Sequence, residues 1–210
     1  MKVLIACEES QVVCQAFRNL GHEAYSCDIQ DCSGGHPEWH IKDDAIKILY
    51  TESWDLVIAH PPCTYLANSG VQHLHKDKNR WELLKEARIL FMEFYNYPGK
   101  IAIENPIPHK YSNLPMYSQI IQPYQFGHTE QKSTCLWLKN VPPLLHTSDN
   151  FYYTKKLPKN IAQRLHYLPK SKDRAKIRSK TFPGIAEAMA KQWGGFASGK
   201  ELSLQTTNGI

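Results

Sequence analysis

Short apolar runs alternate with amphipathic segments along the first half of this 210-residue chain, and this alternation restricts the fold more than any other feature. The runs predict strands and the amphipathic segments predict helices. The expected strands are residues 2–7, 22–27, 54–59 and 100–104, and the expected helices are residues 10–20, 43–51 and 76–97. This succession predicts an α/β fold with a doubly wound, mostly parallel sheet and helices on both faces. Such sheets bind ligands at the carboxyl ends of their strands.

The second half of the chain is less regular. A strand is predicted at residues 134–138 and a helix at 182–193, with little periodicity between them. We therefore divide the chain into a sheet-forming part at 1–139, an irregular basic segment at 140–178, a C-terminal helix at 179–195 that returns to the sheet, and a flexible tail at 196–210.

The formal net charge of +5 is unevenly distributed. Residues 155–180 contain ten of the 25 lysines and arginines but one of the 20 acids, so this stretch is +9 and the remainder is −4. A basic stretch of this kind is typical of proteins that contact nucleic-acid phosphates. A solvated loop has the same composition, and charge alone does not separate the two.

No apolar run approaches the roughly 20 residues that a membrane helix requires. The N-terminal apolar run is short and is followed directly by two acids, which favours a strand over a signal peptide. We therefore expect a cytoplasmic protein with reduced thiols. Four side chains of the types that bind zinc lie close together in the sequence: Cys27, Cys32, His36 and His40. Their spacing fits no common zinc-site pattern. We predict no metal site, and we expect Cys27 to end a strand and the others to lie in the loop after it.

Chemically useful side chains follow each predicted strand of the first half. The segment 7–10 (Cys-Glu-Glu-Ser) follows the first strand, and Asp28 ends the second. An acid at the position of Asp28 binds ribose hydroxyls in nucleoside-binding sheets, although an acid that caps a loop would look the same.

The next two strands end in a thiol and a carboxyl group. Pro61 and Pro62 stiffen the loop that presents Cys63, and a thiolate there would be a strong nucleophile. The alternative is a small buried thiol. Glu104 ends the following strand, where a carboxyl group in a pocket can have a raised pKa and hold a proton. The alternative for Glu104 is a surface acid.

The segments DLVIAHPPC (55–63) and IAIENP (101–106) resemble the catalytic motifs of the cytosine-5 DNA methyltransferases, in the order that family shows. The whole chain is similar to the compact phage and prophage members of the family over most of residues 2–194. The shared landmarks are AHPPCTYLANSG (59–70), AIENPIPHKY (102–111), FGHTEQKSTCLWLKNVPPL (126–144) and SKTFPGIAEAMAKQWG (179–194).

The resemblance implies a class I, Rossmann-like methyltransferase that uses S-adenosylmethionine. Cys63 would attack carbon 6 of cytosine, Glu104 would protonate or hydrogen-bond ring nitrogen 3, and carbon 5 would accept the methyl group. Asp28 would hold the cofactor ribose, and Asp44 would lie near the adenine. The implied cofactor-binding residues are Cys7, Glu8, Glu9, Ser10, Asp28, Ile29, Asp44, His60 and Pro61. The implied substrate and nucleic-acid contacts are Pro62, Asn105, Gln131, Lys132, Lys170, Lys172, Arg174, Lys176 and Arg178.

The chain departs from the family pattern in four places. The turn after the first strand lacks glycine, and Pro106 stands where an aliphatic residue is usual. The Gln-x-Arg-x-Arg motif of the family is represented at best by Gln131-Lys132, and lysine cannot make the forked contacts of arginine. The recognition region is reduced to the 39 residues of 140–178, so we expect relaxed sequence recognition.

Three other functions fit the same residues. The first is the same chemistry on RNA or a free cytosine nucleotide. The second is methylation of an amino group, although that class has an aromatic residue after the prolines, where this chain has Cys63. The third is non-catalytic nucleic-acid binding, which the glycine-free turn favours.

Overall fold

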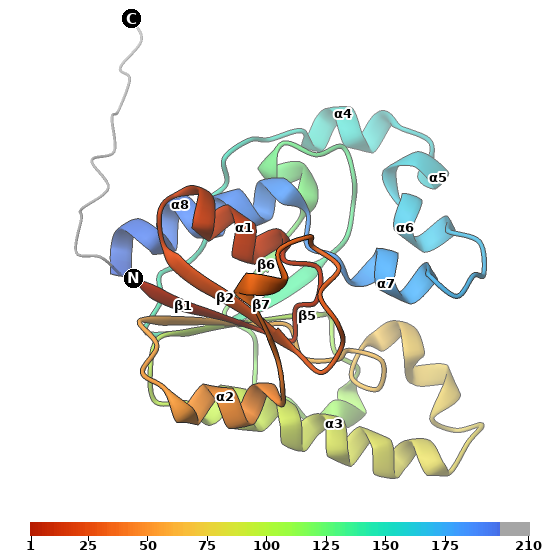
Figure 1. Ribbon diagram of the computed structural model, residues 1–210. Helices are drawn as coiled ribbons and strands as arrows, with labels where there is room; N and C mark the ends of the chain where they lie inside the picture. The colour runs from red at the N-terminus through yellow and green to blue at the C-terminus, as the bar shows by residue number, and fades with distance from the viewer. Residues whose placement is uncertain (198–210) are drawn as a thin grey trace, which may run out of the picture.

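A seven-stranded sheet is the middle layer of the structure, a computed structural model that describes residues 1–197 (Figure 1). The strands are β1 (Lys2–Ala6), β2 (Glu23–Asp28), β3 (His40–Lys42), β4 (Leu56–Ala59), β5 (Ile101–Pro106), β6 (Gln119–Ile121) and β7 (Thr134–Lys139). Their order across the sheet is β3-β2-β1-β4-β5-β7-β6. All neighbouring pairs from β3 to β5 are parallel, and β7 is antiparallel to both β5 and β6.

Helices cover both faces of the sheet. Helices α1 (Val12–Asn19) and α8 (Pro183–Ala197) pack side by side over one face, and α2 (Ala45–Thr51) and α3 (Asn79–Asn96) lie over the other (Figure 1). In β1, Val3 and Ile5 join the core beneath α1 and α8, whereas Leu4 and Ala6 join the core beneath α2 and α3. Burial on both faces explains why this strand is continuously apolar in sequence.

The predicted fold class is confirmed, since the architecture is α/β with a doubly wound, mostly parallel sheet and helices on both faces. The sequence predicted no strand between residues 29 and 42, where the structure has β3. Strand β6 was also not predicted. Both strands have three residues, which is too few for a period of two to be recognised in sequence.

The basic segment forms short helices that lie beyond the carboxyl edge of the sheet (Figure 1). They are α4 (Phe151–Lys156), α5 (Lys159–Ala162), α6 (Arg164–Tyr167) and α7 (Arg174–Ser179). The predicted C-terminal helix is present as α8, but it continues to Ala197 where a tail was expected from residue 196. The remainder of that tail, 198–210, lies outside the described residues.

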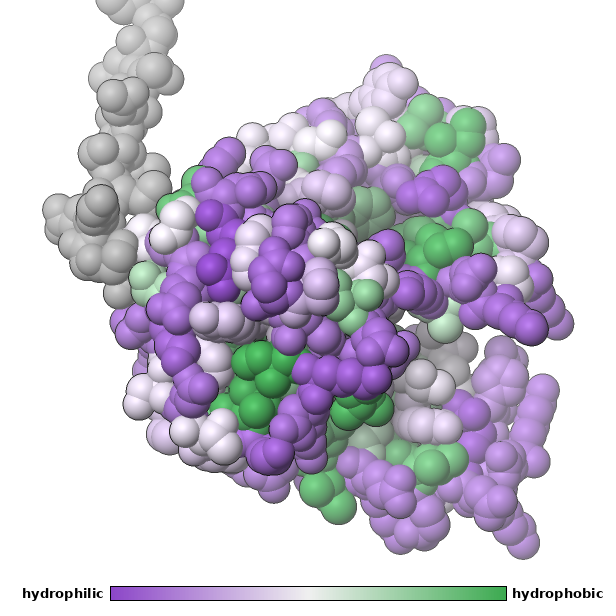
Figure 2. All heavy atoms as spheres, in the orientation of Figure 1, coloured by the Kyte–Doolittle hydropathy of each residue, from purple (hydrophilic) through white to green (hydrophobic). Residues whose placement is uncertain are grey.

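Four short 3-10 helices complete the connections within the described chain: η1 (Pro37–Trp39), η2 (Asn68–His73), η3 (Lys110–Ser112) and η4 (Pro123–Phe126). Among residues 1–197, no helix has both the length and the apolar character needed to cross a membrane. Figure 2 shows a largely hydrophilic face, with a hollow between the surface over α7 and the surface over the chain that follows β4.

Candidate active site

The candidate site lies where the chain reverses its direction across the sheet, between β1 and β4. Strands β1 to β3 extend to one side of this point, and β4 and β5 extend to the other. The loops after β1 and β4 meet here, because the backbone N–H of His60 donates to the carbonyl of Ala6 at 2.9 Å. Doubly wound sheets bind ligands at such a switch point.

The turn after β1 bends without glycine. Cys7 and Gln11 both have φ of 59°, the left-handed region that glycine usually occupies. Ser10 does not cap α1. Gln11 occupies the N-cap position, and the Glu8 carboxylate accepts from the N–H groups of Val13 at 2.8 Å and Cys14 at 3.2 Å.

Glu8 is therefore directed at the start of α1. Burial raises the pKa of its carboxyl group, and the two N–H donors act against that rise. Both carboxylate oxygens of Glu8 accept hydrogen bonds from the first turn of α1, so this side chain supports the turn. The family resemblance had implied a contact between Glu8 and the cofactor.

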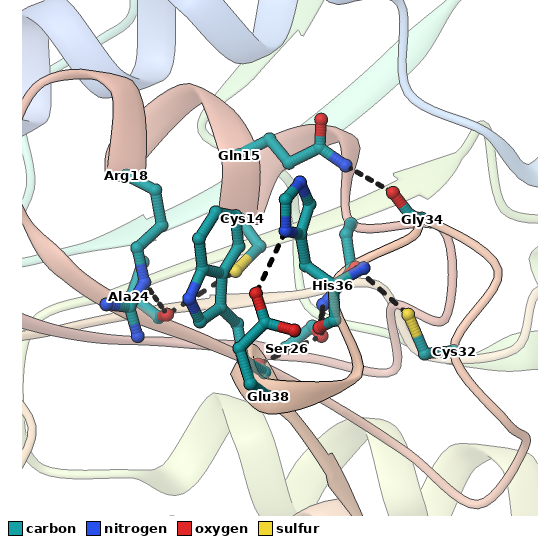
Figure 3. A network of polar contacts seen from close by, with 11 residues as sticks. Cys14, Gln15, Arg18, Ala24, Ser26, Cys32, Gly34, His36 and Glu38 are labelled. Carbon is teal, nitrogen blue, oxygen red and sulfur yellow. Dashed lines mark hydrogen bonds and ion pairs between the residues drawn. The ribbon is translucent and has the colours of Figure 1, made fainter.

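The loop after β2 packs onto the β1 turn, and Figure 3 shows the network that joins them. The Gln11 amide donates to the His36 carbonyl at 2.8 Å and to the Ser26 hydroxyl at 3.2 Å. Its oxygen accepts from the His36 N–H at 3.1 Å and from the Cys32 thiol at 3.0 Å. Gly34 sits so close that an added Cβ would lie 2.4 Å from the Cβ of Gln11. Glycine is therefore required in the loop that covers the turn.

The four residues considered for zinc have other partners. Cys32 and His36 bond to Gln11, and the Cys27 thiol lies 3.5 Å from the carbonyl of Asp43. The ring of His40 contacts the Ser26 hydroxyl through Nδ1 at 2.9 Å. In residues 1–197, no group of three or more His, Cys, Asp or Glu side chains could hold a metal ion.

Three of the predicted cofactor residues meet at the ends of β1, β2 and β3. Burial raises the pKa of the Cys7 thiol, and the charges of Asp28 and Asp44 add to the effect, so these acids lie near it. Asp28 accepts from the N–H of Gln30 at 2.9 Å, and Asp44 caps α2 by accepting from the N–H of Ile46 at 2.8 Å. Ile29, next to Asp28, is 75% exposed.

The loops after β4 and β5 are tied together beneath Cys63. The side-chain N–H of Asn105 donates to the carbonyl of Pro61 at 2.7 Å, and Asn105 is buried. The family resemblance implied that Asn105 contacts the substrate, but in this structure its amide holds the backbone of the Pro-Pro-Cys loop. Pro62 is exposed and Cys63 is partly buried at the same edge of the sheet.

Glu104 lies inside this edge with His60 as its partner. Nδ1 of His60 is 3.2 Å from Oε2 of Glu104, and the two side chains are 10% and 12% exposed. Burial acts to raise the pKa of Glu104, but hydrogen bonds from His60 and Thr134 and the charge of Lys132 outweigh it and lower the pKa. The expected raised pKa is therefore wrong, and Glu104 is ionised at neutral pH.

The electrostatics of Cys63 show which groups surround it. Burial is the main cause that raises the pKa of the thiol, and the charge of Glu104 adds to it. Lys132 and Arg178 act in the opposite direction. The Nζ atom of Lys132 also donates to the carbonyl of Arg178 at 3.0 Å. Glu104, Lys132 and Arg178 thus come from distant parts of the chain to lie near the Cys63 thiol. Because its pKa is raised, this thiol is protonated at neutral pH.

The basic segment is anchored on the same side of the sheet. Nζ of Lys176 lies 3.8 Å from the carboxylate of Glu9, whose other contact is the Ser33 hydroxyl. Gln131 is bound through its backbone N–H to the carbonyl of Ala162 at 2.7 Å.

The remaining basic residues assigned to nucleic acid differ in their exposure. Arg174 donates to the backbone carbonyls of Leu168 and His166, so it holds the turn before α7. Lys170 and Lys172 are exposed.

A groove of about 460 Å³ lies beside the Cys63 loop. Its two walls are joined by a β-bridge between Ala67 and Pro108, which connects the chain after β4 to the chain after β5. The lining residues are Asn68, Val71, Gln72, His75, Ile107, Pro108, His109, Lys110 and Tyr111. This groove was not predicted from the sequence, because the two segments that line it are about 40 residues apart in the chain.

No protein-family model and no curated protein matches this chain. Among solved structures, a methyltransferase of Entamoeba histolytica, EhMeth, is similar with a TM-score of 0.46 and 17% sequence identity. The alignment covers 71% of this chain and 57% of EhMeth, so this chain spans less than two thirds of that protein.

Proposed function

We propose that the protein transfers a methyl group from S-adenosylmethionine to carbon 5 of cytosine in DNA. The observation that carries the proposal is the convergence of Cys63, Glu104 and Lys132 at the carboxyl ends of β4 and β5. A nucleophile, a carboxylate and a cation in one partly buried place suit covalent attack on a heterocyclic ring.

The residues at the ends of β1 to β3 fit the cofactor. The Asp28 carboxylate is only half-buried and is an acceptor for ribose hydroxyls, and exposed Ile29 offers an apolar contact beside it. Asp44 lies near the same point, and its backbone leads into α2. The loops that meet at the switch point contain Glu9, Ser10, His60 and Pro61, and the methionine end of the cofactor would lie against them. When bound, the cofactor supplies an electrophilic methyl group on its sulfonium.

The protein residues would act in a defined order. The Cys63 thiol would first give up its proton to solvent, which the positive charges of Lys132 and Arg178 assist, and the thiolate would then form a bond to carbon 6 of the ring. The electron pair displaced from the ring double bond makes carbon 5 nucleophilic. Glu104 accepts a hydrogen bond from the exocyclic amine, and enclosure beneath the base raises its pKa so that a proton is shared with ring nitrogen 3. Once carbon 5 carries the methyl group, a solvent base would accept the carbon 5 proton, the ring double bond would re-form, and the bond between carbon 6 and Cys63 would break.

The positive charge of residues 155–180 supports a nucleic-acid substrate. Lys176 and Arg178 extend this charge to the turn after β1 and to Cys63. A base within a duplex must leave the stack to reach such a thiol. In this proposal, 1–139 is the catalytic and cofactor-binding part and 140–178 is the reduced recognition segment, with most contacts made to phosphate.

The test is incubation with labelled S-adenosylmethionine and duplex DNA, single-stranded DNA, RNA or a cytidine nucleotide. We expect the label on carbon 5 of cytosine in DNA, and we expect it to be lost in Cys63→Ser and retained in the control Cys32→Ser. DNA with 5-fluorocytosine should trap a covalent adduct at Cys63. Label on an exocyclic amine, or full activity of Cys63→Ser, would refute the mechanism. Calorimetry without heat on adding S-adenosylmethionine would favour a non-catalytic nucleic-acid-binding protein.

A further inference from the structure

His60 is held rigidly between the two catalytic loops. It follows β4 directly, its backbone N–H bonds to Ala6 at 2.9 Å, and Pro61 and Pro62 restrict the chain after it. Its side chain is 10% exposed, so solvent does not compete for its ring nitrogens. The position of the imidazole is thus determined by the sheet.

The contact between His60 and Glu104 has a defined polarity. An ionised carboxylate only accepts hydrogen bonds, so the hydrogen in the 3.2 Å contact lies on Nδ1 of His60. The bond occupies Oε2 of Glu104. This fixed donor, together with the hydrogen bond from Thr134, restricts rotation of the carboxylate.

The second ring nitrogen of His60 indicates a site built for more than packing. Nε2 is buried and has no hydrogen-bond partner among residues 1–197. Glu8 lies near enough to His60 that a charge on the imidazole would lower the pKa of Glu8. Both Glu8 oxygens already accept from α1, so Glu8 is not the partner of Nε2. A buried ring nitrogen without a partner is unfavourable, so its presence calls for an explanation.

We propose that His60 is the positioning residue for Glu104, fixing the carboxylate through Nδ1 so that its other oxygen faces the substrate ring. The role rests on the proposed function, because the ring that Glu104 meets is the proposed substrate. The groups facing His60 are Glu104 and Glu8, and Lys132 and Cys63 lie beyond Glu104. Nothing in the Pro-Pro-Cys motif itself requires a histidine before it.

Two substitutions separate positioning from packing. In His60→Asn the amide N–H can replace Nδ1, whereas in His60→Gln the N–H lies at the position of Nε2 and misses Glu104. His60→Ala removes both ring nitrogens, so no donor remains at either position. The first readout is the pKa of Glu104, followed by carbon-13 NMR of labelled glutamate carboxyls and assigned with Glu104→Gln. We expect this pKa to rise in His60→Ala and His60→Gln and to stay near the wild-type value in His60→Asn.

The second readout is methyl transfer. Loss of a hydrogen bond to a charged group predicts a kcat roughly 10- to 100-fold lower in His60→Ala and His60→Gln, with KM for DNA little changed. His60→Asn should recover most of kcat. An unchanged Glu104 pKa in His60→Ala, or equal loss of kcat in all three variants, would overturn the inference. The NMR measurement needs no substrate, so an absence of methyl transfer in the wild type would count against the proposed function and leave the His60–Glu104 contact tested separately.

Discussion

The ammonium group of Lys176 in α7 lies 3.8 Å from the carboxylate of Glu9 in the turn after β1. These residues are more than 160 positions apart in the sequence. Their contact brings the basic segment to the edge of the sheet where Cys63 and Glu104 lie. A nucleic acid bound along this segment would therefore pass over the candidate site.

Lys176→Ala should weaken nucleic-acid binding with little effect on stability. Lys176 is half-exposed, so its ion pair contributes at most about 1 kcal/mol to folding. If it also contacts phosphate, the affinity for DNA falls several-fold, and the slope of log affinity against log salt decreases by about one. Fluorescence anisotropy at several salt concentrations measures both. The control is Lys191→Ala, which removes a similar exposed ion pair with Glu187 in α8. Equal loss of affinity in both variants would contradict the assignment.

The reactivity of Cys63 should respond in opposite directions to its two charged neighbours. Glu104→Gln removes a negative charge that raises the thiol pKa, so alkylation by iodoacetamide at pH 8 becomes faster. Lys132→Met removes a positive charge that lowers it, so alkylation becomes slower. Mass spectrometry of the Cys63 peptide follows the rate. Exposed Lys85→Met in α3 is the control and should leave the rate unchanged. A change of the same sign in both test variants would exclude this arrangement of charges.

Glu104 should make the protein sensitive to acid. Its folded-state pKa lies below the ordinary 4.5, so the ion stabilises the fold at pH values above 4.5 and this contribution is lost as the pH falls through the folded pKa. The difference in free energy of unfolding between the wild type and Glu104→Gln should therefore shrink as the pH is lowered through that range. Urea titrations at several pH values measure it. Exposed Glu93→Gln should show no such pH dependence, and a difference that grows toward low pH would be the wrong sign.

Gln11→Ala should destabilise the protein more than Gln15→Ala. Gln11 is fully buried and its amide holds His36, Ser26 and Cys32, so its loss costs about 2–3 kcal/mol. Gln15 makes one bond, to the carbonyl of Gly34 at 2.8 Å, and its loss costs about 1 kcal/mol. Urea unfolding gives both values. Equal costs would mean that the loop after β2 does not depend on Gln11.

Gly184→Ala tests the docking of α8. A Cβ at this position would lie 2.0 Å from the backbone carbonyl oxygen of Phe126, so the helix or η4 must move. Overpacking of this kind costs about 1–3 kcal/mol, measured by the midpoint of thermal or urea unfolding. Glu187→Ala on the exposed side of the same helix should change stability by less than about 0.5 kcal/mol. A neutral Gly184→Ala would show that α8 does not sit against η4 as described.

Local sequence patterns determined the four strands and three helices that were expected in the first half of the chain. The apolar run of β1 and the periodic spacing of α3 are visible because each element buries its own residues in a regular period. The same patterns located Cys63 in the loop after β4. They placed Glu104 at the end of its strand, which is wrong, because pairing with β7 continues β5 to Pro106. The missed elements, β3 and β6, are too short to show a period, and the antiparallel direction of β7 depends on its pairing with β5.

Tertiary structure decided the chemistry of the candidate site. The pKa of Glu104 is lowered because His60, Thr134 and Lys132 reach it from three separate segments, whereas sequence position alone suggested the opposite. Cys7 and Gln11 adopt left-handed backbone conformations without glycine, and contacts of Gln11 with the loop after β2 hold that turn. A sequence records local periods and residue types, but electrostatic effects and hydrogen bonds depend on distances that exist only after the chain has folded.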